Sequence, residues 1–158
     1  MMKLVAALLC VSACSGLALA QAPKVGLSPC LLLTKADVKE AAGLAVGDGA
    51  INAHNKAVCD YVPADGSGVM NVSVTPKGPG EGGQKMVDEL KKRNIKAEVV
   101  AGLGDSAYAS SAGFGMQQVG VFKGNYQVIV TVMLMSAPEA KAKAAAMALV
   151  KKALTKVP

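Results

Sequence analysis

The chain of 158 residues has the length of one domain, and hydrophobic residues make up 52% of it against 18% charged residues. This composition excludes a disordered, highly charged chain, because enough apolar surface is present to offset the entropy lost on folding. Lysine and arginine outnumber aspartate and glutamate by 17 to 11, which gives a formal charge of +6, while aromatic residues make up only 3%.

Residues 1–20 have the features of a secretory signal peptide. Lys3 is their only charge, nothing in residues 4–20 is more polar than serine or cysteine, and Ala18-Leu19-Ala20 matches the small-residue cleavage pattern. A membrane anchor would need about 20 apolar residues, which is more than this interrupted run offers. We therefore expect export, cleavage after Ala20 and a periplasmic or extracellular location.

The same segment contains a second processing signal. Val11-Ser12-Ala13-Cys14 has an aliphatic residue three positions before a cysteine, with small residues between, as in the lipobox of bacterial lipoproteins. In such proteins the cysteine becomes the acylated N-terminus and anchors the chain in a membrane. The run after Cys14 stays apolar, whereas lipoprotein tethers are usually polar. Release after Ala20 and lipidation of Cys14 both stay open.

Cys30 and Cys59 are the cysteines that remain as thiols in the mature chain by either route. In an oxidising compartment, two cysteines favour one disulfide, here closing a loop of about 30 residues. The alternatives are a reactive thiol or a metal site. A metal needs three or four ligands at suitable spacing, and the only histidine, His54, lies in a mostly polar loop. We predict no cofactor and no metal.

After a flexible lead-in at residues 21–28, residues 29–158 are predicted to form a single domain. Its first helix begins after Thr34, where Thr34 and Asp37 form a capping motif, and ends at Gly43. Strands are expected next at residues 57–62 and 69–75. The second of these alternates apolar and polar residues, so the sheet has one wet face, which favours antiparallel pairing.

The second half of the chain continues this pattern. A glycine-rich link leads into a helix at residues 84–93, followed by four strands at residues 96–101, 106–110, 117–122 and 126–134. The last helix begins at a capping box from Ser136 to Glu139 and runs to about Lys156. The predicted fold class is α+β, an antiparallel sheet with three helices packed mainly on one face, in the order α-ββ-α-ββββ-α.

Two glycine-rich segments imitate nucleotide-binding loops. Residues 78–85 lack the GxxxxGK[ST] spacing, because Gln84 precedes Lys85 and no hydroxyl comes after it. Residues 102–107 match GxGxxA, but residues 108–113 do not have the pattern of a helix that could hold a pyrophosphate. The acidic residues are scattered and no serine lies in a GxSxG elbow, so no catalytic residue is assigned and an enzyme is not favoured.

Three stretches together resemble a known group of proteins. They are PCLLLTKADV at residues 29–38, Cys59-Asp60-Tyr61, and GLGDSAY at residues 102–108. With the terminal helix rich in alanine and lysine, they are similar to small exported bacterial proteins, many of them lipoproteins, classed as domains of unknown function. The resemblance implies an envelope α+β domain in which Cys30 and Cys59 are bridged, and it implies no reaction.

These observations predict an exported cell-envelope protein that acts as a non-catalytic binding or interaction module. The basic charge favours an unknown envelope protein or an anionic envelope ligand as partner, with a membrane contacted only through a possible lipid anchor. Export and the scarcity of aromatic residues argue against nucleic acid. The alternative is a secreted enzyme inhibitor or a small hydrolase-like enzyme, with a site built from the loops at residues 65–68 and 102–105.

Overall fold

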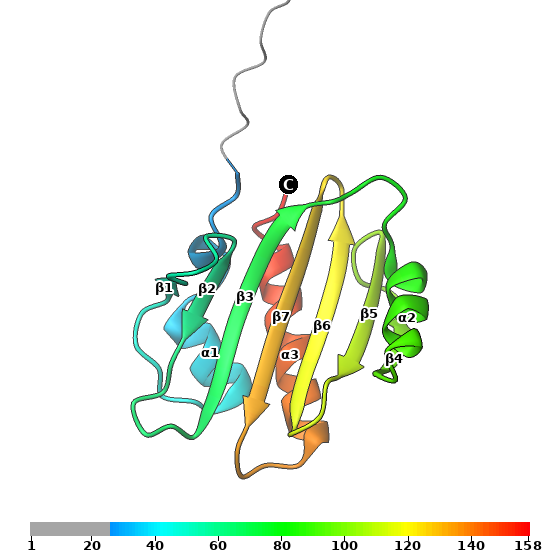
Figure 1. Cartoon of the computed structure of the whole chain (residues 1–158). Helices are drawn as coiled ribbons and strands as arrows, with labels where there is room; N and C mark the ends of the chain where they lie inside the picture. The colour runs from blue at the N-terminus through cyan, green and yellow to red at the C-terminus, as the bar shows by residue number, and fades with distance from the viewer. Residues whose placement is uncertain (1–25) are drawn as a thin grey trace, which may run out of the picture.

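A computed structural model describes residues 26–158, which form one antiparallel sheet of seven strands with helices on both faces (Figure 1). The strand order is β1-β2-β3-β7-β6-β5-β4. The elements are a short 3-10 helix η1 (Pro29–Leu31), α1 (Lys35–Ala42), β1 (Ala50–Ile51), β2 (Val58–Tyr61), β3 (Gly68–Pro76), α2 (Gly83–Lys92), β4 (Lys96–Val100), β5 (Ser106–Ser111), β6 (Met116–Lys123), β7 (Tyr126–Leu134) and α3 (Glu139–Leu154).

The predicted α+β class and the predicted order of helices and strands are confirmed, with the two-residue strand β1 as an addition. The predicted signal peptide at residues 1–20 and the lipidation site Cys14 lie outside the described residues, as does most of the lead-in at residues 21–28.

The main hydrophobic core lies between the sheet and the pair of helices α1 and α3, a side that we call the inner face. α3 packs across β6 and β7, and α1 packs beside α3. Val72 of β3, Val130 of β7 and Val121 of β6 are fully buried in the same core as Ala146 and Leu149 of α3. The small alanine side chains let this helix approach the sheet closely.

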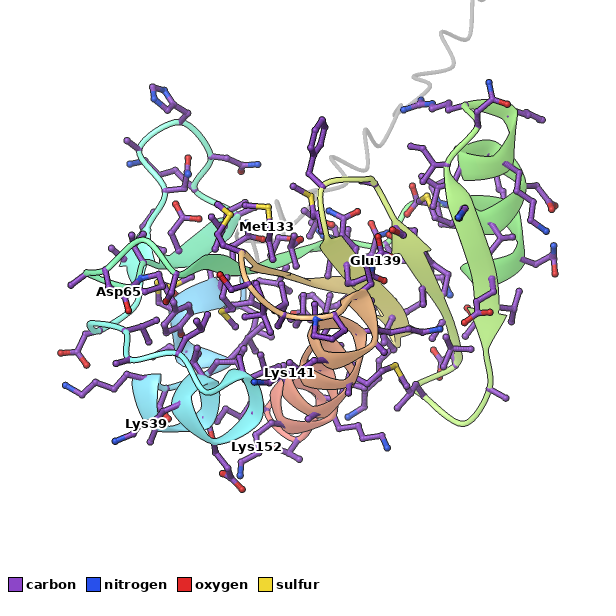
Figure 2. The ribbon with its side chains drawn as sticks, turned by 90° about the horizontal axis from the view of Figure 1, so that it is seen from below. Lys39, Asp65, Met133, Glu139, Lys141 and Lys152 are labelled. Carbon is purple, nitrogen blue, oxygen red and sulfur yellow. A yellow bond between two sulfur atoms is a disulfide. The ribbon has the colours of Figure 1, made fainter. Side chains whose placement is uncertain are left out.

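α2 packs on the opposite side of the sheet, which we call the outer face. Ala107 and Val121 belong to the core under α3, so their sequence neighbours Tyr108 and Phe122 point the other way. There they form a second, smaller cluster with Val87 of α2. α2 is therefore the exception to the predicted packing on one face. Figure 2 shows α1 and α3 on one side of the sheet and Met133 of β7 on the other.

The start of α1 agrees with its sequence prediction. The backbone N–H of Asp37 donates to the hydroxyl of Thr34 at 3.2 Å, and the backbone N–H of Thr34 donates to the Asp37 carboxylate at 2.9 Å. Two orphan donors of the first turn are satisfied in this reciprocal way. The helix ends at Gly43, whose φ of +74° is the left-handed conformation expected of a glycine at this position.

The predicted start of α3 is wrong. The N-cap of α3 is Pro138, with ψ at 145° and no side-chain cap, and Ser136 caps nothing in the helix. The proline ring disfavours a helical conformation for Ala137 before it, so the helix begins only at Glu139. The chain leaves the helix after Leu154, where a turn carries it to Lys156, within two residues of the predicted end.

Candidate binding groove

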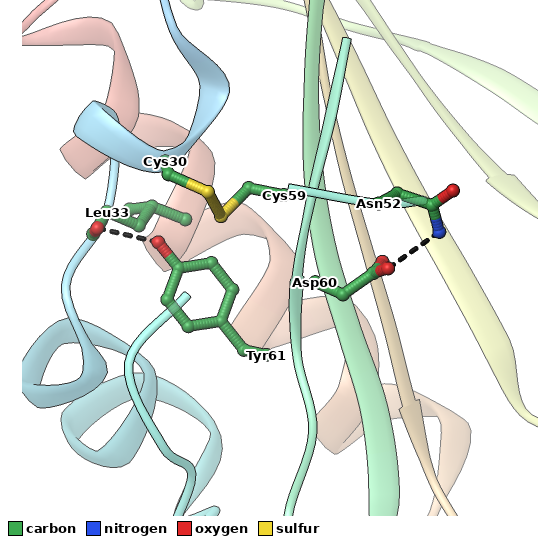
Figure 3. Close-up of a disulfide and its surroundings, with 6 residues drawn as sticks. All are labelled: Cys30, Leu33, Asn52, Cys59, Asp60 and Tyr61. Carbon is green, nitrogen blue, oxygen red and sulfur yellow. Dashed lines mark hydrogen bonds between the residues drawn. A yellow bond between two sulfur atoms is a disulfide. The ribbon is translucent and has the colours of Figure 1, made fainter. Parts of the chain in front are cut away.

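Two of the segments that carry the family resemblance, residues 29–38 and 59–61, meet under the edge of the sheet. Cys30 and Cys59 form a disulfide, which confirms the predicted pairing (Figure 3). Next to it, the hydroxyl of Tyr61 donates to the carbonyl oxygen of Leu33 at 2.6 Å. Asp60, on the other face of β2, accepts a hydrogen bond of 2.7 Å from the side-chain amide of Asn52. These residues hold the region before α1 and the hairpin of β1 and β2 against the core.

The third stretch, at residues 102–108, also serves the fold. Asp105 accepts a 2.8 Å hydrogen bond from the backbone N–H of Gly124, which ties the loop between β4 and β5 to the turn between β6 and β7. The hydroxyl of Ser106 accepts from the backbone N–H of Gly83 at 3.1 Å and so acts as the missing cap of α2. The segment is therefore the loop before β5 and the start of that strand, and it also caps α2.

Tyr108 completes the structural role of this stretch. Its ring lies directly over Gly120, where any β-carbon would overlap it, and packs beside Phe122 under α2. The side chain is 3% exposed, and burial raises the pKa of Tyr108 to about 12. The hydroxyl is thus neutral at physiological pH, and the residue is an internal packing group of the outer face.

The two loops considered for an enzyme site are far apart. Residues 65–68 precede β3 at the end of the sheet where β7 finishes, because Gly68 pairs with Leu134. Residues 102–105 lie at the other end, beside the turn that precedes β7. β7 itself has nine residues and so spans about 30 Å. The structure does not bring these loops together, and a site built from both is excluded.

A different site lies on the inner face, between the first turns of α3 and the edge strand β4. α3 covers β6 and β7 but leaves the inner side of β4 uncovered, and a groove of about 310 Å³ remains there. Its polar lining residues come from β4 (Lys96 and Glu98), β5 (Ser110 and Ser111), β6 (Gln117) and α3 (Glu139 and Lys143). A groove of this volume is within the usual range for a small-molecule site.

The charges of the groove fall into two groups. Lys143 forms an ion pair with Glu98 that joins α3 to β4, and the hydrogen bond from Lys143 holds the pKa of the Glu98 carboxyl below its ordinary value. Lys96 and Glu139 have no ion-pair partner within residues 26–158. The groove therefore offers one unpaired cation on the strand and one unpaired anion on the helix.

Polar groups without charge line the groove between these walls. The side-chain amide of Gln117 donates to the hydroxyl of Ser111 at 2.9 Å, and Gln117 is only 5% exposed. This bond fixes the orientation of the amide, so the floor of the groove presents a set arrangement of donors and acceptors. The lining contains no histidine and no cysteine.

A second cavity, of about 320 Å³, lies between α1 and α3. Lys152 of α3 contacts the carboxylates of Asp37 at 3.5 Å and Glu40 at 3.6 Å. Burial acts to raise the pKa of Asp37, but hydrogen bonds from Thr34 and the contact with Lys152 together hold it below its ordinary value. Because these charges satisfy one another, this cavity is a weaker candidate than the groove beside β4.

The groove residues were not predicted from the sequence. Glu139 and Lys143 are four apart on one helix face, and Lys96 and Glu98 are two apart on one strand face, so each pair could be predicted to point the same way. Nothing in the sequence places β4 opposite the start of α3. His54, which was considered as a metal ligand from the sequence, is exposed on its loop and does not line the groove.

The described part of the chain offers neither a metal cluster nor a membrane span. No group of three or more histidine, cysteine, aspartate or glutamate side chains comes together in residues 26–158 in a way that could hold a metal ion. No helix among those residues is long and apolar enough to span a bilayer.

The chain was also compared with family models, curated proteins and solved structures. It matches no family model, no curated protein and no solved structure in these comparisons.

Proposed function

We propose that this protein is an exported, non-catalytic binding module of the cell envelope that holds a small polar ligand in the groove between α3 and β4. The signal-like N-terminal segment and the Cys30–Cys59 disulfide support a compartment in which thiols oxidise. The groove supports binding, because it combines a suitable volume with polar groups fixed on rigid elements.

The observation that carries the proposal is the pair of opposite charges in the groove. A ligand with only a negative charge would meet the Glu139 carboxylate, and one with only a positive charge would meet the Lys96 ammonium. A ligand that carries both a negative and a positive group can pair with the Lys96 ammonium on β4 and the Glu139 carboxylate on α3. We therefore assign the groove to zwitterionic ligands, of which short peptides with free ends are the simplest envelope example.

Binding is tested with an isotope-labelled chain and a library of dipeptides and tripeptides whose ends are free. The expected result is a saturable shift of the amide resonances of residues 96–98, 109–111 and 139–143. Blocking the amino end or the carboxyl end of the peptide, or introducing Lys96→Ala or Glu139→Ala, is expected to weaken binding by about tenfold, since each change removes a charged contact.

The matched control is the pair of variants Lys85→Ala and Glu89→Ala, which change one cation and one anion on α2, on the outer face. These variants are expected to bind the peptides as the parent chain does. No saturable shift with any free-ended peptide, or equal binding of peptides with blocked ends, would contradict the proposal.

A further inference from the structure

Three loops at one end of the sheet each present an exposed apolar side chain. Val62 comes directly after β2, whose last residue pairs near the start of β3. Met135 comes directly after β7, which finishes opposite the start of β3. Phe114 lies in the turn between β5 and β6, and β6 starts opposite Met133 at the same end. This end, which we call the loop end, is the lower end of the sheet in Figure 1.

The exposure of these side chains is large. Phe114 is 98% exposed, Val62 is 67% exposed and Met135 is 61% exposed. From the strand order and the spacing of about 5 Å between strands, the three loops lie along a line of about 15–20 Å. These three side chains bury little apolar surface within the chain, and their arrangement along a line would let them contact a flat apolar partner together.

The backbone holds Phe114 outward. Its φ of +52° is in the left-handed region, which a bulky residue rarely adopts, and both flanking residues are glycines with positive φ, Gly113 at +85° and Gly115 at +73°. The turn therefore keeps the ring away from the sheet beside it.

A strip of exposed or half-buried apolar side chains lies behind the tips on the outer face. Val69 of β3 pairs with Met133 of β7, and Met133 pairs in turn with Met116 of β6. One row of three neighbouring strands is therefore apolar, whereas the next row, formed by Asn71 and Thr131 with their neighbour Gln118, is polar. On β3, β7 and β6 the apolar row therefore lies next to the loop end and a polar row follows it.

Cations outnumber anions at this same end. Lys96 begins β4 opposite Ser111 and so lies near the turn that carries Phe114. The cations are Lys91 and Lys92 at the end of α2, Arg93 after it, Lys96, and Lys141 in the first turn of α3, against the anions Asp65 and Glu139. Lys143 and Glu98 neutralise each other. Apolar tips bordered by lysine and arginine complement the interface of an anionic bilayer, in which the apolar groups enter below the headgroups.

We propose that the loop end docks on an anionic lipid surface, with Val62, Phe114 and Met135 inserted at the level of the headgroups and acyl boundary. Val62, Phe114 and Met135 do not line the groove, whereas Lys96 and Glu139 belong to both surfaces. The inference goes beyond the proposed ligand binding, because Phe114→Ser removes an inserting side chain without changing any residue of the groove. Docking of this kind needs no lipid on Cys14, since the contact is made by side chains of the folded domain.

The test uses the chain from Gln21, which carries every described helix and strand, with vesicles of phosphatidylcholine alone or mixed with phosphatidylglycerol. Sedimentation with the vesicles is expected to rise with the phosphatidylglycerol fraction and to fall with added salt. Phe114→Ser is expected to weaken vesicle binding by about tenfold or more, because it removes the most exposed apolar group.

The matched control is Leu31→Ser, since Leu31 is 67% exposed but belongs to η1, away from the loop end. It is expected to bind the vesicles as the parent chain does, and unchanged thermal unfolding verifies that both variants fold. Any one of three results overturns the proposal. The first is no sedimentation with phosphatidylglycerol vesicles, and the second is binding that depends on charge and salt but is unaffected by Phe114→Ser. The third is self-association that Phe114→Ser abolishes, without vesicle binding, which would assign the loop end to a second copy of the chain.

Discussion

The hydroxyl of Tyr61 donates a 2.6 Å hydrogen bond to the carbonyl oxygen of Leu33, 28 residues earlier in the chain. Tyr61 is completely buried and Leu33 is 2% exposed, so the hydrogen bond lies inside the protein. The Cys30–Cys59 disulfide joins the same two segments through neighbouring residues. One hydrogen bond and one covalent bond therefore fix the position at which the chain enters α1.

Replacing Tyr61 by phenylalanine leaves the packing of the ring but removes the donor. The Leu33 carbonyl then stays buried without this partner, and we expect the free energy of unfolding to fall by about 1–3 kcal/mol. Urea unfolding with an unchanged denaturant slope measures the loss. Tyr126→Phe is the control, since the Tyr126 hydroxyl has no side-chain hydrogen bond among the described residues, and it should change stability by less than about 0.5 kcal/mol. Equal losses in the two variants would contradict this assignment.

The disulfide between Cys30 and Cys59 closes a loop with a sequence separation of 29. In the chain-entropy model, such a bond stabilises the folded state by about 3–4 kcal/mol, because it restricts the unfolded chain. Thermal unfolding with and without reductant is expected to show a loss of this size in the parent chain. The double variant Cys30→Ala/Cys59→Ala should be insensitive to reductant, and a parent chain that is equally insensitive would count against a structural bond.

Gly120 is required by the ring of Tyr108. A β-carbon at residue 120 would overlap Cε1 and Cζ of that ring, which Val87 and Phe122 keep in place. Gly120→Ala is therefore expected to cost about 1–3 kcal/mol of stability through overpacking. Gly47→Ala, whose β-carbon meets nothing within 4 Å, is the control and should be close to neutral.

A double-mutant cycle separates this overlap from a general effect of alanine in a strand. In the background Tyr108→Ala the ring is gone, so adding Gly120→Ala should cost far less than it does alone. If the two losses simply add, the ring is not the reason for the glycine.

The individual elements could be predicted because their signals are local. β3 alternates Met70, Val72 and Val74 with polar residues, and the capping motif of Thr34 and Asp37 lies within one turn. The pairing of β3 with β7 could not be predicted in this way, since periodicity identifies a strand but not its partner. The groove depends on such distant packing, of β4 against the start of α3, and so it had no local signal.

The outer-face position of α2 shows the same limit. Tyr108 and Phe122 lie on strands that are buried on both faces around them, and the apolar stripe of α2 is visible in the sequence. Which face of the sheet the helix covers depends on the link at residues 78–82, whose glycines permit either direction. The cap from Ser106 to Gly83 then fixes the choice, and its two partners are 23 residues apart.

The buried hydroxyl of Tyr108 makes stability depend on alkaline pH. Burial raises the pKa of Tyr108 from 10.0 to about 12. Above its unfolded pKa, the unfolded chain loses this proton while the folded chain keeps it. The unfolded state then binds fewer protons, so the free energy of unfolding falls as pH rises through the folded pKa, and this contribution is fully present below the unfolded pKa.

Urea unfolding at a series of pH values up to about 12 measures this effect against Tyr108→Phe. Burial also raises the pKa of Tyr61, but Tyr61 is present in both proteins, so its effect largely cancels in the difference. The parent chain is expected to lose on the order of 2 kcal/mol more than the variant across this range. Parallel pH curves would contradict this prediction. They would mean that the Tyr108 hydroxyl ionises in the folded protein as easily as in water, despite its enclosure between α2 and Gly120.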